Sequence, residues 1–478
     1  TTSQLNIHFP QVELILDPHK MEDAFSMTVV GQVHRSLLRY TPGGDVVPDL
    51  ASEWKESADH KSYVFKLRGL TFSDGKQIEA RHVQMSFARL FRIGAAIGAD
   101  IDYIEGASEF RKSGDLSKLG IKVVSPLEIE FRLKNPSALF LKHVAVADCA
   151  ILPLENFDAP IAFDESTGFS GPYKVVERDK SGAVTVEKWR SDILESKMPP
   201  KRLRFFPTSE SAITLANSGA TDCLDHDPVS ADERSKLLSE KWTETATELI
   251  GETYVILNPK KISADLRKAM VSVINPVEVA KLLGNKYTPA FGAIPRGVPG
   301  EMRSEDYPKL APASAVKGSV NLEFDPNNPV HQKVQPFLTK KWEALGINVN
   351  LVPLAKRELL KRVFGSACEV CIGQKGLDYP DGYSVLTYFK SGYESNYFYV
   401  KNHNIDALID KSGTFLDKEA REQSYREIQQ LVLKEHTLLP LAFGSEASGL
   451  WSSKIKSVPP HVIGYHMLPF ETVEMAGQ

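Results

Sequence analysis

The sequence lacks the features that would tie it to a membrane or to nucleic acid. No run reaches the roughly 18 uncharged apolar residues that span a bilayer, because the longest candidate, residues 144–154, is interrupted by Asp148 and Pro153. Acidic and basic residues nearly balance, 61 against 57, and no segment is rich in Lys or Arg. This balance favours neither a nucleic-acid partner nor an anionic lipid surface.

Cysteine is scarce, with four residues in 478, a count that allows two disulfides but requires none. Cys368 and Cys371 have the C-x-x-C spacing of redox and metal sites, yet they lie in residues 367–373, which have the pattern of a buried strand. Side chains three apart on a strand point to opposite faces. We therefore expect two buried structural thiols, with a disulfide or a ligand role as the alternative. Cys149 and Cys223 have no such motif around them.

Local motifs of catalysis are also missing. The chain has no G-x-S-x-G elbow, no P-loop, no G-x-G-x-x-G and no H-E-x-x-H. The twelve histidines are scattered, and the spacing of His461 and His466 is no recognised metal motif. The sequence therefore predicts no enzyme, no cofactor and no resident metal, although catalytic groups can converge from distant positions.

The patterns that are present indicate an α/β protein with mixed sheets and more than one domain. Residues 127–133 alternate apolar and polar side chains, which predicts a half-buried strand. Asn275, Pro276 and Glu278 form a helix start, and Gly284 suits its end. Another amphipathic pattern ends at Gly346, directly before a predicted strand over 347–352.

Between residues 45 and 87 the sequence carries an ordered series of short motifs. Residues 48–54 read P-D-L-A-S-E-W, 63–68 read Y-V-F-K-L-R, 72–75 read F-S-D-G, and 83–87 read V-Q-M-S-F. In this order the series closely resembles the signature of the family 5 (cluster C) extracellular solute-binding proteins. That family includes the oligopeptide-, dipeptide- and nickel-binding components of ABC importers. Further similar elements cover essentially the whole chain: L-D-P at 16–18, G-F-S-G-P-Y at 168–173, N-P at 258–259, I-P at 294–295 and L-D-Y-P-D at 377–381.

The resemblance implies a two-lobed, type II periplasmic-binding-protein-like fold with a hinge and an extra domain on the first lobe. The first lobe would combine residues 1–40, 168–250 and 451–478. Residues 41–167 would form the extra domain, and residues 251–450 the second lobe. The ligand would be enclosed between the lobes, because it favours the closed state, and the closed form would be presented to a permease.

The resemblance also assigns the ligand anchor. Asp378 matches the aspartate of the family's W-x-x-D-Y element, which pairs with the α-ammonium group of peptide ligands; alternatively it only caps the loop before Pro380. The family tryptophan is replaced here by Lys375. Lys375 could neutralise Asp378 internally, recruit an acidic group of the ligand, or simply face solvent.

Other site residues follow from their positions in matching segments. Glu22, Ala24 and Phe25 correspond to an extended segment that pairs with the main chain of a peptide ligand. Further candidates fall in segments that line the cleft in the family: Tyr254, Tyr379, Tyr383, Asn396 and Tyr397. His19 and His34 would matter only if the ligand were a metal chelate.

The function implied is the substrate-binding component of an ABC importer, with short peptides as the favoured ligand and opines, metal chelates, sugars or haem as rivals. A ligand-sensing domain of a regulator, or an enzyme built on the scaffold, are the alternatives from other classes. The implied protein is a monomer that works with the permease subunits. It would be periplasmic or tethered to the outer face of a membrane, in a mature form without a signal peptide.

Overall fold

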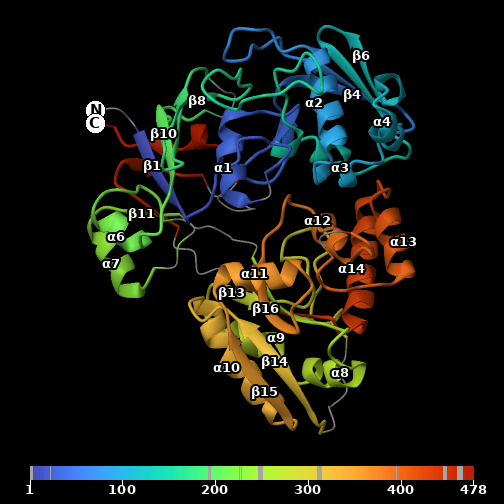
Figure 1. Cartoon of the computed structure of the whole chain (residues 1–478), viewed down its shortest axis with the longest axis vertical. Helices are drawn as coiled ribbons and strands as arrows, with labels where there is room; N and C mark the ends of the chain where they lie inside the picture. The colour runs from blue at the N-terminus through green and yellow to red at the C-terminus, as the bar shows by residue number, and fades with distance from the viewer. Residues whose placement is uncertain are drawn as a thin grey trace. The chain divides into compact units, whose positions relative to one another are not determined.

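The computed structural model describes residues 4–21, 23–191, 195–224, 227, 229–245, 251–308, 315–393, 396–444, 449–459 and 467–477. The chain forms two compact units (Figure 1): unit 1 comprises Thr1–Thr247 with Ala447–Gln478, and unit 2 comprises Glu248–Glu446. Unit 2 is thus inserted as one continuous segment into unit 1. Among the described residues, no helix is long and apolar enough to cross a membrane.

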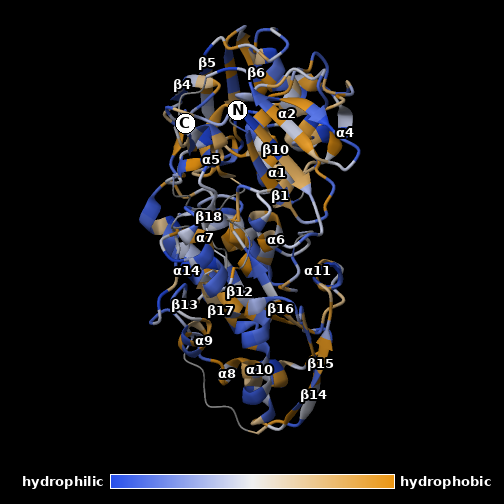
Figure 2. Ribbon diagram, turned by 90° about the vertical axis from the view of Figure 1, so that its left-hand side faces the viewer, coloured by the Kyte–Doolittle hydropathy of each residue, from blue (hydrophilic) through white to orange (hydrophobic). Residues whose placement is uncertain are grey.

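Unit 1 contains a four-stranded mixed sheet built from distant parts of the chain. Its strands, in sheet order, are β1 (Gln4–Phe9), β10 (Arg202–Pro207), β9 (Val184–Lys188) and β8 (Tyr173–Arg178). β1 pairs in parallel with β10, and the other pairings are antiparallel. Helix α1 (Ala24–Val33), which is largely hydrophobic (Figure 2), contributes to the core of this sheet, as do Trp451 and Phe470 from the C-terminal segment.

A second sheet in unit 1 is antiparallel throughout. Its strands, in sheet order, are β4 (Ala51–Glu56), β5 (Ser62–Leu67), β7 (Glu128–Arg132) and β6 (Ile121–Ser125). Helix α2 (Ala80–Ile93) covers one face, and Phe87 packs on Phe131 with ring centroids 5.0 Å apart. The division of unit 1 into a lobe and an extra domain over residues 41–167 stays a prediction.

The remaining helices and strands of unit 1 are shorter: β2 (Leu38–Tyr40), β3 (Val46–Pro48), α3 (Ile97–Asp100), α4 (Ala107–Ser113), α5 (Phe140–His143), α6 (Ala212–Asn217), α7 (Ala231–Ser239), β11 (Thr243–Glu244), β18 (Leu450–Trp451), β19 (Ile455–Ser457) and β20 (Glu474–Met475).

A buried ion-pair cluster joins the beginning and the end of the chain in unit 1. Glu471, which is fully buried, accepts hydrogen bonds from the guanidinium groups of Arg35 and Arg39, the latter at 3.1 Å. Nε of Arg35 lies 3.5 Å from a carboxylate oxygen of Asp49. Both arginines are only 6% exposed. The C-terminal segment is therefore held against the N-terminal part by charge as well as by apolar packing.

Unit 2 is built on one six-stranded mixed sheet. Its strands, in sheet order, are β13 (Tyr287–Pro289), β17 (Leu438–Gly444), β12 (Glu252–Leu257), β16 (Val370–Lys375), β14 (Gly318–Phe324) and β15 (Ile347–Pro353). β14 runs parallel to β15 and β16, and the other pairs are antiparallel. Helix α9 (Pro276–Leu283) packs against β13 and β17, and α10 (Pro329–Glu343) against β14 and β15 (Figure 1). The other helices of the unit are α8 (Ala264–Ser272), α11 (Lys356–Phe364), α12 (Tyr383–Leu386), α13 (His403–Ser412) and α14 (Lys418–Lys434).

The structure confirms the predicted helix cap, the predicted helix end and two of the predicted strands. Asn275 caps α9 by accepting a hydrogen bond from the Val277 backbone N–H, and Gly284 ends the helix at a φ of 110°. β15 follows Gly346 directly, and the alternating segment near residue 130 is β7. The predicted mixed sheets are present in both units.

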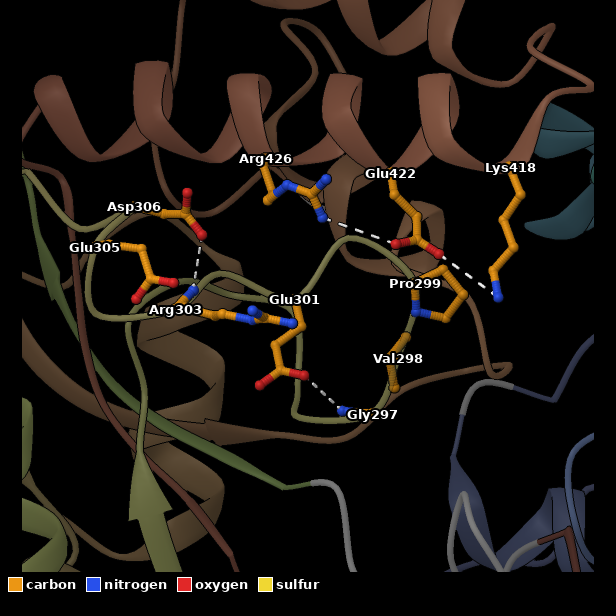
Figure 3. Close-up of a pocket in the computed structure, with 10 residues that line it drawn as sticks. All are labelled: Gly297, Val298, Pro299, Glu301, Arg303, Glu305, Asp306, Lys418, Glu422 and Arg426. Carbon is orange, nitrogen blue, oxygen red and sulfur yellow. Dashed lines mark hydrogen bonds and ion pairs between the residues drawn. The ribbon is translucent and has the colours of Figure 1, made fainter.

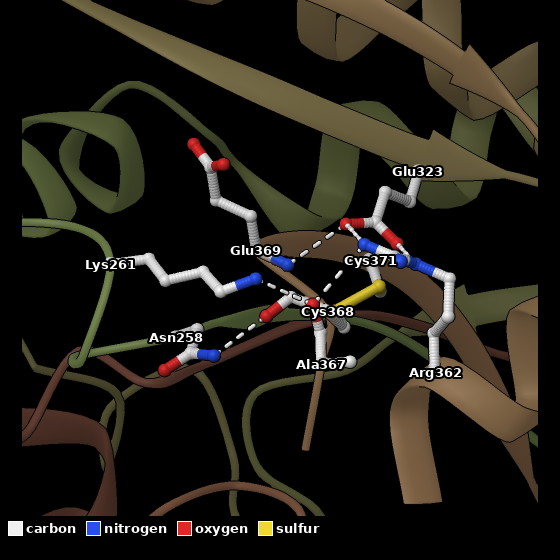
Figure 4. Close-up of a disulfide and its surroundings, with 8 residues drawn as sticks. All are labelled: Asn258, Lys261, Glu323, Arg362, Ala367, Cys368, Glu369 and Cys371. Carbon is white, nitrogen blue, oxygen red and sulfur yellow. Dashed lines mark hydrogen bonds and ion pairs between the residues drawn. A yellow bond between two sulfur atoms is a disulfide. The ribbon is translucent and has the colours of Figure 1, made fainter. Parts of the chain in front are cut away.

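The prediction of two free thiols at Cys368 and Cys371 is wrong, because the two residues form a disulfide (Figure 4). β16 begins only at Val370, and a bend at Glu369 precedes it. Cys368 therefore lies outside the strand, and the alternation of strand side chains does not apply to it. Cys149 and Cys223 are buried free cysteines.

The disulfide lies beside a buried carboxylate, but the group is no metal site. The ligand atoms of Glu323, Cys368 and Cys371 lie within 4.8 Å of one another. However, the sulfurs are bonded to each other, and the Glu323 carboxylate is held by two hydrogen bonds from Arg362, at 2.5 and 3.0 Å. It also accepts the backbone N–H of Glu369 at 3.0 Å. The oxidised cysteines and the paired carboxylate leave no ligand set for a cation.

Replacing both Cys368 and Cys371 by serine is expected to lower the free energy of unfolding by about 2 kcal/mol, the entropy of closing a loop of roughly four residues. Urea unfolding monitored by circular dichroism measures the loss. A reductant should reduce the stability of the native protein and leave the double variant unchanged. Equal stability of the two proteins under oxidising conditions would contradict the expectation.

Candidate functional site

Several of the predicted ligand residues of unit 2 lie on or near the ends of two neighbouring strands, β12 and β16. Lys375 is the last residue of β16 and lies directly opposite Glu252, the first residue of β12. Two pairs further along the same ladder, Tyr254 lies opposite Gly373. Asp378 follows three residues after the end of β16.

Glycine at position 373 gives room for the ring of Tyr254. A Cβ atom at this position would lie 2.5 Å from Cε2 of Tyr254, which is closer than van der Waals contact allows. Glycine in a strand interior often marks such a close approach. Tyr254 is 3% exposed, and its ring packs on Phe398 with centroids 5.1 Å apart.

Gly373→Ala is therefore expected to displace the Tyr254 ring and to cost about 1–3 kcal/mol of stability, as overpacking in a core does. Thermal unfolding of the purified variant measures the cost. Gly376→Ala is the matched control, because a Cβ atom there meets nothing within 4 Å. If the two variants unfold at the same temperature, the close approach at Gly373 does not affect the stability of the protein.

Lys375 is surrounded by aromatic rings. Its Nζ lies 4.4 Å from the ring centroid of Tyr388, 5.5 Å from that of Phe398 and 5.9 Å from that of Phe389. Such positions attract a cation to the ring faces. Nζ is buried and has no hydrogen-bond partner among the residues that the structure describes. Burial lowers the pKa of Lys375 to about 8, against the effect of Glu252 and Asp378, which raise it.

Glu252 is a buried carboxyl group that sequence reasoning missed. It is 2% exposed, and in the described part of the chain neither of its oxygens has a hydrogen-bond partner. Burial raises the pKa of Glu252 to about 8, although the charge of Lys375 lowers it. The only signal that could have found it is its pairing with Lys375, which depends on the register of two strands from distant parts of the chain.

Asp378 is the exposed acid of this group. One of its carboxylate oxygens, Oδ2, accepts a hydrogen bond from the hydroxyl of Tyr388 at 3.0 Å. The surrounding protein raises the pKa of Asp378, while the Tyr388 hydrogen bond and the Lys375 charge lower it, and the net shift is upward. Among the described residues, no donor hydrogen-bonds to the second oxygen of this carboxylate.

Tyrosines complete the cluster. The ring of Tyr397 packs on Tyr388 with centroids 5.5 Å apart and on Phe398, which also contacts Tyr254, with centroids 5.0 Å apart. Contacts thus join Tyr254, Lys375, Asp378 and Tyr397 into one group, together with Glu252. Burial raises the pKa of Tyr397, so its hydroxyl stays protonated at neutral pH.

The remaining predicted residues of unit 2 make other contacts. Tyr379 is 3% exposed. Tyr383 packs on Tyr425 with ring centroids 6.4 Å apart. The amide nitrogen of Asn396 donates to the carbonyl oxygens of Lys390 and Val400, and so closes the loop between them.

In unit 1 the extended segment expected at Ala24 and Phe25 is wrong, because both residues open helix α1. The carboxylate of Asp23 caps this helix by accepting the backbone N–H groups of Phe25 and Ser26, at 3.0 and 2.8 Å. A main chain used in this way is not available for pairing with a peptide at Phe25. Glu22 lies outside the described residues. Any part of Ala24 and Phe25 in ligand binding stays a prediction.

His19 and His34 lie in a buried cluster that does not suit a metal ion. Nδ1 of His19 faces the guanidinium of Arg89 at 2.9 Å, and Arg89 is held by both carboxylate oxygens of Asp17, at 2.9 and 2.6 Å. A guanidinium beside the imidazole opposes a second cation. Burial lowers the pKa of each histidine to about 3, so both rings are neutral at physiological pH.

A separate pocket of about 440 Å³ lies in unit 2 between the loop of residues 297–306 and helix α14 (Figure 3). Its charged side chains engage their neighbours: Glu422 pairs with Lys418 at 3.8 Å and with Arg426 at 3.7 Å. Glu301 accepts the backbone N–H of Gly297 at 2.9 Å. The pocket contains none of the predicted ligand residues.

Comparisons with known proteins agree with this picture. The model of "Bacterial extracellular solute-binding proteins, family 5 Middle" matches residues 45–397. The chain is 27% identical over 457 residues to the probable D,D-dipeptide-binding periplasmic protein DdpA of Escherichia coli, covering 88% of this chain and 84% of the relative. It is 22% identical over 475 residues to the glutathione-binding protein GsiB of Salmonella typhi, covering 91% and 89%.

Solved structures show the same fold. The structure of OppA from Burkholderia pseudomallei superposes with a TM-score of 0.79 at 19% identity, covering 100% of this chain and 99% of the other. The murein tripeptide binding protein MppA of Escherichia coli gives a TM-score of 0.79 at 19% identity, with 99% of each chain covered. The predicted fold class, that of the two-lobed periplasmic binding proteins, is confirmed.

Proposed function

The chain belongs to the bacterial extracellular solute-binding proteins of family 5, and on that premise we propose that it is the substrate-binding component of an ABC importer for short peptides. The observation that carries the proposal is the cluster at the ends of β12 and β16 in unit 2, where an open carboxylate lies among tyrosine hydroxyls. Tyrosine combines a large contact area with one polar group, which suits ligands of varied side chains. The relatives named for dipeptide and glutathione binding support a peptide ligand.

Capture by closure of the two units on the ligand is part of the proposal. A ligand that makes more contacts in the closed state shifts the protein toward that state. The closed monomer would then be the form that the permease subunits accept. Members of this family are substrate-binding proteins, and we propose that this chain performs no catalysis.

The disulfide between Cys368 and Cys371 supports a place outside the cytoplasm. Disulfides persist in the periplasm and on cell surfaces, whereas the cytosol keeps thiols reduced. Several relatives are named as periplasmic proteins. We therefore propose that the protein works in the periplasm or at the outer face of a membrane.

Native mass spectrometry of the protein as purified, followed by denaturing release, tests the proposal. A bound mixture of short peptides is the expected result, and titration with tri- to pentapeptides should give one site per chain. Asp378→Asn is expected to weaken binding about tenfold, because a hydrogen bond to a charged acceptor is lost.

Asp410→Asn is the matched control, since Asp410 is an exposed acid of unit 2 that pairs only with Lys390 among the described residues. It should leave the affinity unchanged. A single non-peptide compound in the purified protein, or equal effects of the two substitutions, would refute the peptide ligand or the site, respectively.

A further inference from the structure

Three ionisable groups meet at the end of the β12–β16 ladder. Glu252 and Lys375 lie opposite each other, and Asp378 follows on the next turn of the chain. The charge of Lys375 acts on both acids, lowering the pKa of each. Yet no ion pair joins Lys375 to any acidic side chain in the described ranges.

The position of Lys375 is fixed by its aromatic surroundings. Tyr388, Phe389 and Phe398 lie around Nζ, and this atom is closed off from solvent. The same Tyr388 donates its hydroxyl to Asp378. One ring, that of Tyr388, thus contacts both the ammonium group of Lys375 and, through its hydroxyl, the carboxylate of Asp378.

Glu252 does not compete for this ammonium charge at neutral pH. Its carboxyl group is buried without a described hydrogen-bond donor, and its pKa of about 8 keeps it protonated. A buried, uncompensated carboxylate is costly, so the neutral form is favoured. At neutral pH the remaining charges of this group are the positive charge of Lys375 and the negative charge of Asp378.

We propose that Lys375 is a built-in counter-ion of Asp378. The site would then take peptides and related solutes whose end next to Asp378 is uncharged, such as N-acylated peptides. The proposal rests on the function proposed above. An ammonium group of a ligand would find the Asp378 charge already neutralised, and would meet the like charge of Lys375 beside it. The open oxygen of Asp378 still accepts a hydrogen bond from a neutral N–H or O–H group.

Calorimetric titration with trialanine and N-acetyl-trialanine at pH 7 and low salt tests the proposal. The native protein is expected to bind the two within about threefold of each other. In Lys375→Met the Asp378 charge is no longer neutralised, and the free peptide should gain about tenfold over the acetylated one. Lys390→Met, which removes an exposed lysine of the same unit, should leave the ratio unchanged.

The proposal is overturned if the native protein prefers the free peptide by tenfold or more, or if Lys375→Met does not change the ratio. Lys375→Gln replaces Lys375→Met should the latter fail to fold.

A measurement without ligand separates this proposal from the function proposed above. Lys375→Met should lower the melting temperature by several degrees, and adding Asp378→Asn should recover part of that loss, because the two charges are coupled. Additive shifts would refute the coupling. If neither peptide binds, the peptide function fails, and the melting temperatures of the single and double variants alone decide whether Lys375 neutralises Asp378.

Discussion

Replacing Glu471 by glutamine is expected to lower the free energy of unfolding by about 3–5 kcal/mol, the cost of removing one partner of a buried ion pair. Glu471 is fully buried and receives hydrogen bonds from Arg35 and Arg39. Without the carboxylate charge, two nearly buried guanidinium groups would lose the acid that accepts hydrogen bonds from both, although Asp49 still lies 3.5 Å from Arg35. Urea unfolding followed by tryptophan fluorescence reports the loss, because Trp451 lies in the same unit as Glu471.

Glu474→Gln provides the matched control for this prediction. Glu474 lies three residues further along the chain and pairs with Lys456, whose side chain is 62% exposed. Exposed pairs contribute little to stability, so this variant should unfold at nearly the native urea concentration. Equal midpoints for Glu471→Gln and Glu474→Gln would mean that the buried cluster is not needed to hold the C-terminal segment.

Acidification from pH 7 to pH 5 is expected to cost about 4 kcal/mol of stability through His19 and His34. In the unfolded chain each imidazole has a pKa near 6.5, and in the folded protein burial lowers it to about 3. Between these values the unfolded state binds more protons, so stability is complete above pH 6.5 and falls as the pH drops toward 3. At pH 5 each histidine contributes about 2 kcal/mol of that loss.

Urea unfolding at pH 7, 6 and 5 measures this slope. His34→Leu removes one of the two groups, so its loss of stability between pH 7 and 5 should be about 2 kcal/mol smaller than that of the native protein, whatever its effect at pH 7. His403→Gln, at a fully exposed position of unit 2, should keep the native slope. Equal losses for the native protein and His34→Leu would show that His34 does not stay neutral in the folded protein.

The sequence predicted those parts of the fold that depend on neighbouring residues. The cap at Asn275, the end at Gly284 and the alternation in β7 are all set within a few positions, and each is present. The motif series between residues 45 and 87 predicted the family, because several short motifs in a fixed order identify a family more specifically than any one of them alone. The exact start of a strand is less determined, and a shift of β16 to Val370 was enough to overturn the prediction for Cys368.

The site was predicted only in part, for a physical reason. Asp378 and Lys375 stand in a motif and could be singled out from the sequence alone. Glu252 could not, since its importance depends on strand register and on the absence of any described donor near it. The position of Lys375 likewise depends on its contacts with the rings of Tyr388, Phe389 and Phe398. The extended form expected at Ala24 and Phe25 rested on the resemblance alone, whereas the carboxylate of Asp23 caps a helix that begins at Ala24.

The insertion of unit 2 into unit 1 has a consequence for how the chain is made. β1 precedes unit 2 in the chain, yet the core that it enters also contains Trp451 and Phe470, which follow unit 2. During synthesis, unit 2 therefore has all its strands before the core around β1 is complete. Contacts between such distant residues form slowly. The core around β1 is thus expected to form late, after unit 2 can already fold.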